Sequence, residues 1–387
     1  MARPVILTFT GFYLPGYKAG GPIRSVANLV AHLGDTYDFR IVTRDRDAGE
    51  ARPYPGIQPY KWQTVGNAQV FYMPQSTQIF STVARLMRET PHDQVYLNSF
   101  FDARSSTLPL LAQRMRLVPR RTVILAPRGE FSAGALGIKS AKKRAFMAAA
   151  RAAGLHRDVL WHASSEHEAA DIRATIGPAV STQIASDLPR AVQGGLSHTP
   201  RAPAEPLRVL FLSRVSPMKN LTFAIETLAQ TTVPVILSIV GPINNENAYW
   251  AECQARIAQL PSHITVRYDG VVPAAEVPTV MAQNDLFFLP TLGENFGHVI
   301  IEALGAGTPA LISNRTPWQD LNQAGCGWVE QLGDPKLFAD RIDILFHESS
   351  EATAARRKAA FDYAVRFDAD SSVLEDNRRL FKERASQ

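Results

Sequence analysis

Cysteine is scarce in this 387-residue sequence, and its scarcity excludes several classes of protein. The two cysteines, Cys253 and Cys326, are far apart and have no metal-ligand spacing around them. Neither a disulfide framework nor a zinc site is therefore predicted, and we expect a reducing compartment.

Long apolar runs are also missing. No segment approaches the ~18 apolar residues of a membrane-spanning helix. The apolar run at residues 5–9 is too short for a secretory signal. Hydrophobic residues make up 45% of the chain and charged residues 20%, which is typical of a globular protein, and the length suits two domains. We expect a cytoplasmic protein.

Charge is unevenly distributed along the chain. Residues 1–190 contain 24 lysines and arginines against 14 acidic residues, whereas residues 191–387 contain 17 against 22. A basic first half indicates a polyanionic partner, either an anionic membrane surface or a phosphorylated acceptor. Nucleic acid is disfavoured because the basic residues are not interleaved with aromatic residues that could stack on bases.

Short apolar strands alternate with helical patterns throughout, which predicts an α/β fold with parallel sheets. The expected strands of the first half are residues 5–9, 39–43, 70–72, 95–97, 122–126 and 159–163. Those of the second half are residues 208–212, 235–240, 264–266, 285–289 and 310–312. Between the two series, residues 187–206 are rich in proline and glycine, as a linker would be.

The segment from Pro290 to Pro309 carries two carboxylates, Glu294 and Glu302. Its pattern predicts a loop after a buried strand and then a helix over residues 297–306. Ligands of open α/β sheets bind outside the carboxyl ends of the strands, so both carboxylates would face one site. A glycosidase acid/base pair would instead need its carboxylates on opposite sides of a glycosidic bond. The pattern suits a ligand rich in hydroxyl groups beside an anion.

Two cations follow the first strand of the second half. Arg214 and Lys219 lie on a loop that leads to Asn220, a candidate N-cap for the next helix. Fixed cations at a helix N-terminus are suited to a pyrophosphate. In the first half, Gly20 and Gly21 open a helix after the first strand, where bare backbone can approach an anion closely.

The combined pattern resembles the retaining glycosyltransferases of family 4, which have the two-domain GT-B fold. The residues that carry the resemblance are Gly20-Gly21, Ser213-Arg214, Lys219-Asn220, Val240 to Pro242, Asp269 to Val272 and Glu294 to Pro309. The resemblance implies two Rossmann-like domains in tandem, facing each other across a cleft. Residues 1–190 would bind the acceptor, 191–206 would form the linker, 207–360 would bind the nucleotide sugar, and a helix in 361–387 would pack back on the first domain.

The resemblance also implies roles for single residues. Arg214 and Lys219 would neutralise the diphosphate of a nucleotide-sugar donor, Glu294 would lie at the donor sugar, and Glu302 would hold the ribose hydroxyls. The remaining donor-side residues are Gly20, Gly21, Gly241, Val271, Asn295, Phe296 and Gly297. Neither a metal nor a cofactor is implied, because the nucleotide sugar is a substrate. The pairs Asp45/Asp47 and Asp368/Asp370 are interpreted as solvated loop charges.

The acceptor is expected to be a glycan or a lipid-linked sugar bound by the first domain. The acceptor-side candidates follow predicted strands or lie just beyond them: Asn98, Arg128, Glu130, Lys139 and His162. The basic helix expected over residues 134–154 would attach the protein to the inner face of the cytoplasmic membrane.

Two other functions remain open at this point. A sugar-nucleotide 2-epimerase has the same architecture, and so would a non-catalytic sugar-nucleotide-binding protein. A dehydrogenase is disfavoured because no complete G-x-G-x-x-G follows a strand with an acidic residue about 20 positions on.

Overall fold

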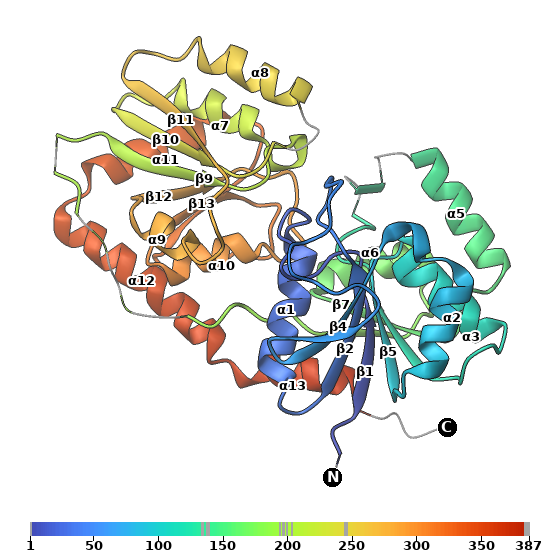
Figure 1. Ribbon diagram of the computed structural model, residues 1–387. Helices are drawn as coiled ribbons and strands as arrows, with labels where there is room; N and C mark the ends of the chain where they lie inside the picture. Colours follow the sequence, from blue (N-terminus) through green and yellow to red (C-terminus); the bar gives the residue numbers. More distant parts are fainter. Residues whose placement is uncertain are drawn as a thin grey trace. The chain divides into compact units, whose positions relative to one another are not determined.

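The computed structural model describes residues 2–132, 135–136, 140–192, 195, 198, 200–202, 204–243 and 247–382. The chain forms two compact units, each built on its own sheet (Figure 1). The first unit runs to Leu188 and includes the segment from Ser371 onward, and the second runs from Pro189 to Asp370.

The first unit contains an eight-stranded sheet in which only the pairing of β3 with β4 is antiparallel among the described strands. Its strands, in order across the sheet, are β3 (Trp62–Val65), β4 (Ala68–Met73), β2 (Asp38–Arg44), β1 (Val5–Phe9), β5 (Gln94–Asn98), β6 (Thr122–Ala126), β7 (Val159–Ala163) and β8 (Thr182–Ile184). Its helical segments are α1 (Gly21–Leu33), η1 (Gln75–Thr77), α2 (Phe80–Glu89), η2 (Ala103–Thr107), α3 (Leu108–Arg114), α5 (Ser140–Ala152), α6 (Glu166–Ile176) and α13 (Ser371–Leu380).

Successive side chains of a strand point to opposite faces of the sheet. Because the inner strands carry apolar side chains in both directions, both faces of this sheet are apolar. On one face Ile124 belongs to the same buried cluster as Val26 of α1 and Leu380 of α13. On the other face Leu125 belongs to the cluster that includes Val83 of α2 and Leu110 of α3. Helices therefore cover the sheet on both sides, as parallel sheets require.

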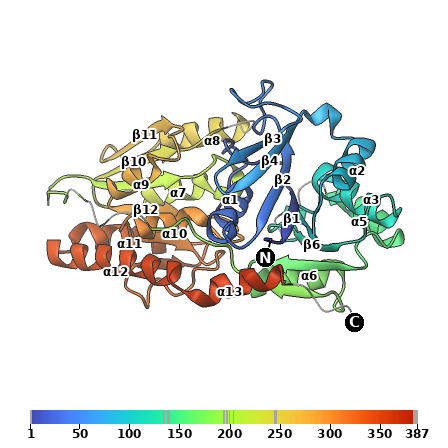
Figure 2. The same cartoon turned by 60° about the horizontal axis from the view of Figure 1, so that its bottom comes forward.

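The second unit contains a six-stranded, fully parallel sheet. In order across the sheet its strands are β11 (Ile264–Gly270), β10 (Val235–Val240), β9 (Leu207–Leu212), β12 (Leu286–Leu289), β13 (Ala310–Ser313) and β14 (Gly327–Glu330). Its helical segments are η3 (Pro217–Lys219), α7 (Leu221–Leu228), α8 (Asn247–Ile257), α9 (Val277–Ala282), α10 (His298–Gly305), α11 (Pro335–His347) and α12 (Ser350–Asp368). Figure 2 shows α10 and α12 near each other, and they pack together.

Some boundaries differ from the expected ones. Strands β3, β8 and β14 were not expected, because they are short and lie at or beside the sheet edges. Helix α12 runs to Asp368 within the second unit, so the chain returns to the first unit at Ser371 rather than at residue 361. Helix α13 packs against α1.

The described residues of the expected linker pack on the second unit. The Val192 amide donates to Asp368 Oδ2 over 3.3 Å. The distance from His198 Nδ1 to the carbonyl oxygen of Ala282 is 3.0 Å. The Arg201 guanidinium lies over the ring of Phe346. This segment is fixed to the domain that follows it and is not a loose tether.

Candidate functional site

The carboxyl ends of β9, β10 and β11 come together around Gly241. A Cβ built on Gly241, whose φ is +140°, would lie 2.0 Å from the carbonyl oxygen of Ser213. The Gly241 amide donates to the Gly270 carbonyl over 2.7 Å, and the Tyr268 hydroxyl donates to the Gly241 carbonyl over 3.0 Å. Any side chain at this position would push the loop after β10 away from the loop after β9, so the site requires glycine here.

Hydrogen bonds also join the loop after β9 to the loop after β12. The Leu292 amide and the Thr291 hydroxyl both donate to the Met218 carbonyl, over 2.9 and 3.0 Å. The Asn220 side-chain amide donates to the Pro290 carbonyl over 3.0 Å. Asn220 stands at the N-cap position of α7 with φ +59°, but its side chain does not cap the helix. The expectation that it caps α7 is wrong, because the side chain bridges the two loops instead.

Lys219 and Glu294 meet across this junction, where Lys219 Nζ donates to Glu294 Oε1. Their side chains are only 14% and 10% exposed. The Glu294 amide donates to the Arg315 carbonyl over 2.9 Å, which fixes the backbone that carries the carboxylate. Arg214, on the same loop as Lys219, is exposed and forms no ion pair with a residue in the described part of the chain. The site therefore holds one compensated cation and one exposed cation.

Helix α10 begins at the same edge of the sheet. Its N-cap residue, Gly297, has φ +81° and no side chain with which to cap the helix. The first turn contains no acidic residue, so no carboxylate there offsets the positive end of the helix. Glu302 lies one turn further along and is half-buried. This arrangement offers backbone donors to an anion and a carboxylate to hydroxyl groups.

Trp318 supports the start of α10 and had no signal in the sequence. Its indole Nε1 donates to the Phe296 carbonyl over 2.6 Å, and the two rings pack with centroids 5.1 Å apart. The Phe296 side chain is buried, so only its backbone faces the site. Such a contact joins segments 22 residues apart and follows no periodic pattern.

The second unit brings its predicted site residues to one edge of one sheet, because β9 to β12 are all parallel. The residues that follow those strands are Arg214, Lys219, Gly241, Val271, Glu294, Asn295, Phe296, Gly297 and Glu302. Gly20 and Gly21 belong to the first unit, where Gly20, with φ +75°, is the N-cap residue of α1. The cleft between the two units stays a prediction.

In the first unit, Arg128 lies in a buried network. Its guanidinium forms an ion pair with Asp187 and donates from Nε to Asn98 Oδ1 over 3.1 Å. It also donates to the Tyr96 hydroxyl over 2.6 Å. The Arg128 and Asp187 side chains are each only 5% exposed, and Asn98 is buried. The expectation that Asn98 and Arg128 face an acceptor is wrong, because both side chains are buried and Asn98 Oδ1 and the Arg128 guanidinium form hydrogen bonds within the fold.

His162 belongs to the same network. Its Nδ1 lies 2.8 Å from the Tyr96 hydroxyl and its Nε2 lies 2.8 Å from the Ala185 carbonyl oxygen. Burial, and then the charge of Arg128, lower the pKa of His162 to about 4, so the imidazole is neutral near pH 7. The interpretation that His162 orients an acceptor hydroxyl is wrong, since neither ring nitrogen is available.

Glu130 shapes the loop after β5. Its carboxylate accepts hydrogen bonds from the Ser99 hydroxyl over 2.6 Å and from the amides of Phe100 and Phe101 over 2.6 and 3.1 Å. Burial raises the pKa of Glu130, although these hydrogen bonds oppose the shift. Among the acceptor-side candidates, Glu130 is the one whose carboxylate fixes the backbone of the loop after β5. Lys139 lies outside the described residues.

One of the two aspartate pairs also differs from expectation. Asp45 and Asp47 are buried, and Asp47 accepts hydrogen bonds from the amides of Tyr17 and Lys18 over 2.9 and 3.1 Å. They are not solvated loop charges, because Asp47 anchors the glycine-rich loop before α1 and the buried Asp45 carboxylate pairs with Arg46. No cluster of three metal-ligating side chains occurs in the described ranges. None of the helices there is long and apolar enough to cross a bilayer.

Comparison with known proteins finds similarity mainly in the second unit. Residues 197–361 match the family model of the glycosyl transferases group 1. Phosphatidyl-myo-inositol mannosyltransferase of Mycobacterium leprae is 30% identical over 169 residues, which span 41% of this chain and 43% of the relative. O-antigen chain mannosyltransferase B of Escherichia coli is 34% identical over 79 residues, 20% of this chain and 18% of the relative. The chain thus matches less than half the length of these relatives.

A solved structure extends the likeness in fold to both units. The structure of Anabaena Alr3699/HepE, solved in complex with UDP and glucose, superposes with a TM-score of 0.71 at 20% identity. The superposition covers 98% of each chain. The predicted fold class, two Rossmann-like domains in tandem as in GT-B glycosyltransferases, is confirmed.

Proposed function

We propose that this protein is a retaining glycosyltransferase that moves a hexose from a nucleotide-sugar donor to a glycan or a lipid-linked acceptor. The observation that carries the proposal is the convergence of Arg214, the Lys219–Glu294 pair and the start of α10 on one edge of the second sheet. The match of residues 197–361 to the group 1 glycosyl transferases supports it.

In the proposed reaction an acceptor oxygen forms a bond to the anomeric carbon, and the bond from that carbon to the diphosphate breaks. Negative charge then develops on the leaving diphosphate, and stabilising this charge is the main electrostatic task of the enzyme. Arg214, Lys219 and the amides at the start of α10 perform it. Glu302 holds the ribose hydroxyls, and Glu294 both positions Lys219 and lies at the sugar.

The acceptor and the setting are proposed from the relatives and from charge. One relative is named for a phosphatidylinositol acceptor and another for O-antigen chains. A role in cell-surface polysaccharide synthesis at the inner face of the cytoplasmic membrane fits these names. Lys142, Arg144 and Arg151 of α5 are exposed and would contact anionic lipid.

A donor panel tests the proposal. The purified protein is incubated with UDP, GDP, dTDP and ADP sugars, with and without a lipid extract, and release of nucleoside diphosphate is measured. We expect release that depends on the extract for at least one donor. A 2-epimerase would release no free nucleotide when given the extract but would convert the donor to its epimer, and a binding protein would release none and leave the donor unchanged.

Site variants make the test specific. Glu302→Ala should raise KM for the donor, because the ribose hydroxyls lose their acceptor, while Arg214→Ala should lower kcat. Glu348→Ala serves as a control, since that carboxylate pairs with Arg356 away from the candidate site. Unchanged kinetics in both site variants would remove the assignment.

A further inference from the structure

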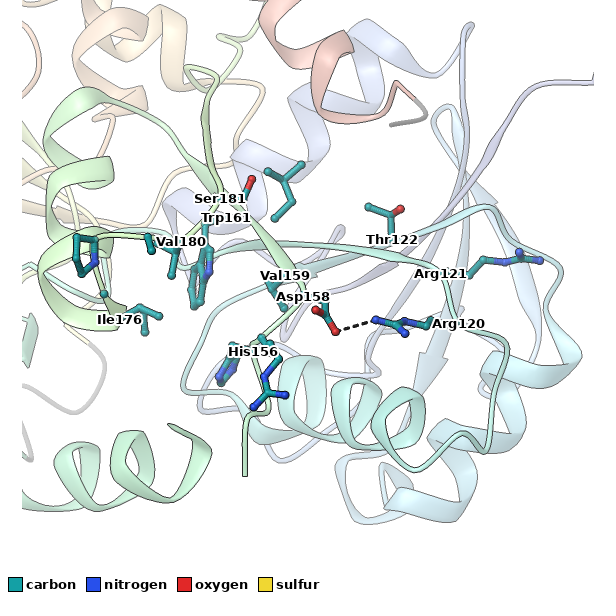
Figure 3. A pocket seen from close by; sticks show the side chains of 15 residues that line it. Arg120, Arg121, Thr122, His156, Asp158, Val159, Trp161, Ile176, Val180 and Ser181 are labelled. Carbon is teal, nitrogen blue, oxygen red and sulfur yellow. Dashed lines mark hydrogen bonds and ion pairs between the residues drawn. The ribbon is translucent and has the colours of Figure 1, made fainter. Parts of the chain in front are cut away.

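A hollow of about 790 Å³ lies at the amino-terminal edge of the first sheet, where the segments leading into β6, β7 and β8 meet (Figure 3). Ligands of parallel sheets are bound at the opposite, carboxyl-terminal edge. The hollow is therefore separate from the donor-site residues and from the loops expected to meet the acceptor. Its volume falls in the range of ~300–1,000 Å³ that is usual for small-molecule sites.

The hollow is basic. Arg120, Arg121 and Arg157 line it, and Asp158 is the acidic residue among its lining residues. Asp158 Oδ2 accepts hydrogen bonds from Arg120 over 2.8 Å and from Arg114 over 3.4 Å. One carboxylate therefore faces several guanidinium groups and cannot neutralise them all.

The three lining arginines are positioned differently. Arg121 is fixed, because its Nε donates to the His92 carbonyl over 2.9 Å. The Arg120 side chain is 79% exposed, and Figure 3 shows it directed toward Asp158. Arg157 is also exposed and forms no ion pair with any residue that the structure describes. Figure 3 shows the Arg121 side chain directed away from Asp158, so Arg120 and Arg157 are the adjustable cations that can hold a tetrahedral anion, whose oxygens guanidinium groups bind in pairs.

The rest of the wall is apolar or neutral. Val159, Ile176 and Val180 present aliphatic surface. Burial, and then Arg114, lower the pKa of His156 to about 4, so its imidazole adds no charge near pH 7. A ligand that fits this wall carries an uncharged body beside its anionic group.

We propose that this hollow binds a phosphate monoester or diester, with Arg120 and Arg157 at the phosphate and the neutral wall against the body it is attached to. Such a group comes from a soluble phosphate ester or from the head group of a phospholipid. The site does not depend on the proposed transferase reaction, since none of its residues belongs to the candidate site of the second unit.

Hydrogen exchange of the full-length protein tests the proposal and localises binding. The probes are glycerol 3-phosphate in solution and phosphatidylglycerol vesicles diluted in phosphatidylcholine, each compared with chloride at equal ionic strength. We expect slower exchange in residues 154–159 and 176–181. Protection by glycerol 3-phosphate identifies a soluble ester, and protection by the vesicles alone identifies a lipid head group. If neither probe protects these segments, the proposal is overturned.

Two variants sharpen the result. Arg120→Ala with Arg157→Ala should weaken binding of the effective probe by about tenfold or more, as the loss of charged hydrogen bonds predicts. With glycerol 3-phosphate, the matched double variant Lys142→Ala with Arg144→Ala should keep wild-type affinity, because these exposed cations of α5 do not line the hollow. Asp158→Asn should tighten binding, since it releases two guanidinium groups from their carboxylate. Equal losses in the two double variants would show unspecific charge attraction and overturn the site.

Discussion

Lys219 and Glu294 form an ion pair that joins the loops following β9 and β12 of the second sheet. The two residues are 75 positions apart, and each is less than one-sixth exposed. Their pairing means that the cation proposed to face the diphosphate is already oriented by the carboxylate proposed to face the sugar.

This pairing predicts that removing the charge of either residue lowers the catalytic efficiency. Lys219→Ala should lower kcat/KM by about 10²–10³, the usual effect of removing one group that stabilises a leaving anion. Glu294→Gln should also lower it, because Lys219 loses its orienting partner. Steady-state kinetics with the preferred donor measures both. Lys358→Ala, which breaks an exposed pair with Asp362, should leave the kinetics unchanged.

Gly241 predicts a steric defect. Gly241→Ala places a methyl group 2.0 Å from the Ser213 carbonyl oxygen, so it should cost about 1–3 kcal/mol of stability and weaken donor binding. Gly333→Ala is the matched control, because Gly333 has φ +122° but nothing within 4 Å of the added methyl. Thermal unfolding and donor titration distinguish the two variants. Equal effects in both would show that backbone strain alone, and not the contact with Ser213, is responsible.

The buried pair of Arg128 and Asp187 predicts a large effect on stability. Asp187→Asn leaves the Arg128 guanidinium buried without its counter-charge, which should cost about 3–5 kcal/mol. Asp376→Asn breaks an exposed pair with Arg379 and should cost less than about 1 kcal/mol. Urea unfolding measures both free energies. An Asp187→Asn protein of wild-type stability would contradict the structural role assigned to this network.

His162 predicts a dependence of stability on pH. Its pKa is lowered to about 4 by burial, whereas the unfolded chain titrates near its ordinary value of 6.5. Between these values the unfolded state binds a proton that the folded state excludes, so stability falls as the pH falls, by about 1.4 kcal/mol per pH unit. From about pH 7 to about pH 5 the wild type should lose about 2 kcal/mol more than His162→Gln.

Urea unfolding at the two pH values measures this difference. Burial raises the pKa of Glu168, so the contribution of Glu168 to stability changes with pH in the opposite direction to that of His162. Both proteins contain Glu168, so its contribution cancels when their pH dependences are compared. Identical pH dependence of the two proteins would show that His162 is protonated within the fold.

The sequence predicted those parts of the molecule that follow from local periodicity and from glycine. Apolar runs gave the inner strands of both sheets, because a strand covered on both faces must be apolar throughout. The edge strands β3, β8 and β14 were missed, since they are short and partly exposed. The loop residues of the second unit were predicted at the correct sheet edge, because parallel strands bring their carboxyl ends together.

Polar residues at strand ends could not be interpreted in the same way. Asn98, Arg128 and His162 follow or end strands of the first sheet, as site residues commonly do. Inside the fold, however, Arg128 bonds to Asn98 and Asp187, and His162 bonds to the Ala185 carbonyl. Asp47 likewise holds the loop before α1. Packing decides whether such a side chain faces solvent or bonds to a residue far along the chain, as Arg128 does with Asp187, 59 positions away. Packing of this kind produces no periodic pattern in the sequence.

The sequence by itself determined the two α/β domains and the placing of Arg214, Lys219, Glu294 and Glu302 after neighbouring strands, because topology follows from the order and the apolar character of the strands. Only the tertiary structure decided which charges are compensated. It paired Lys219 with Glu294, buried Arg128 against Asp187, and gathered Arg120, Arg121 and Arg157 around one hollow. The physical reason is that charge pairing is set by distances of a few ångströms between segments far apart in the chain.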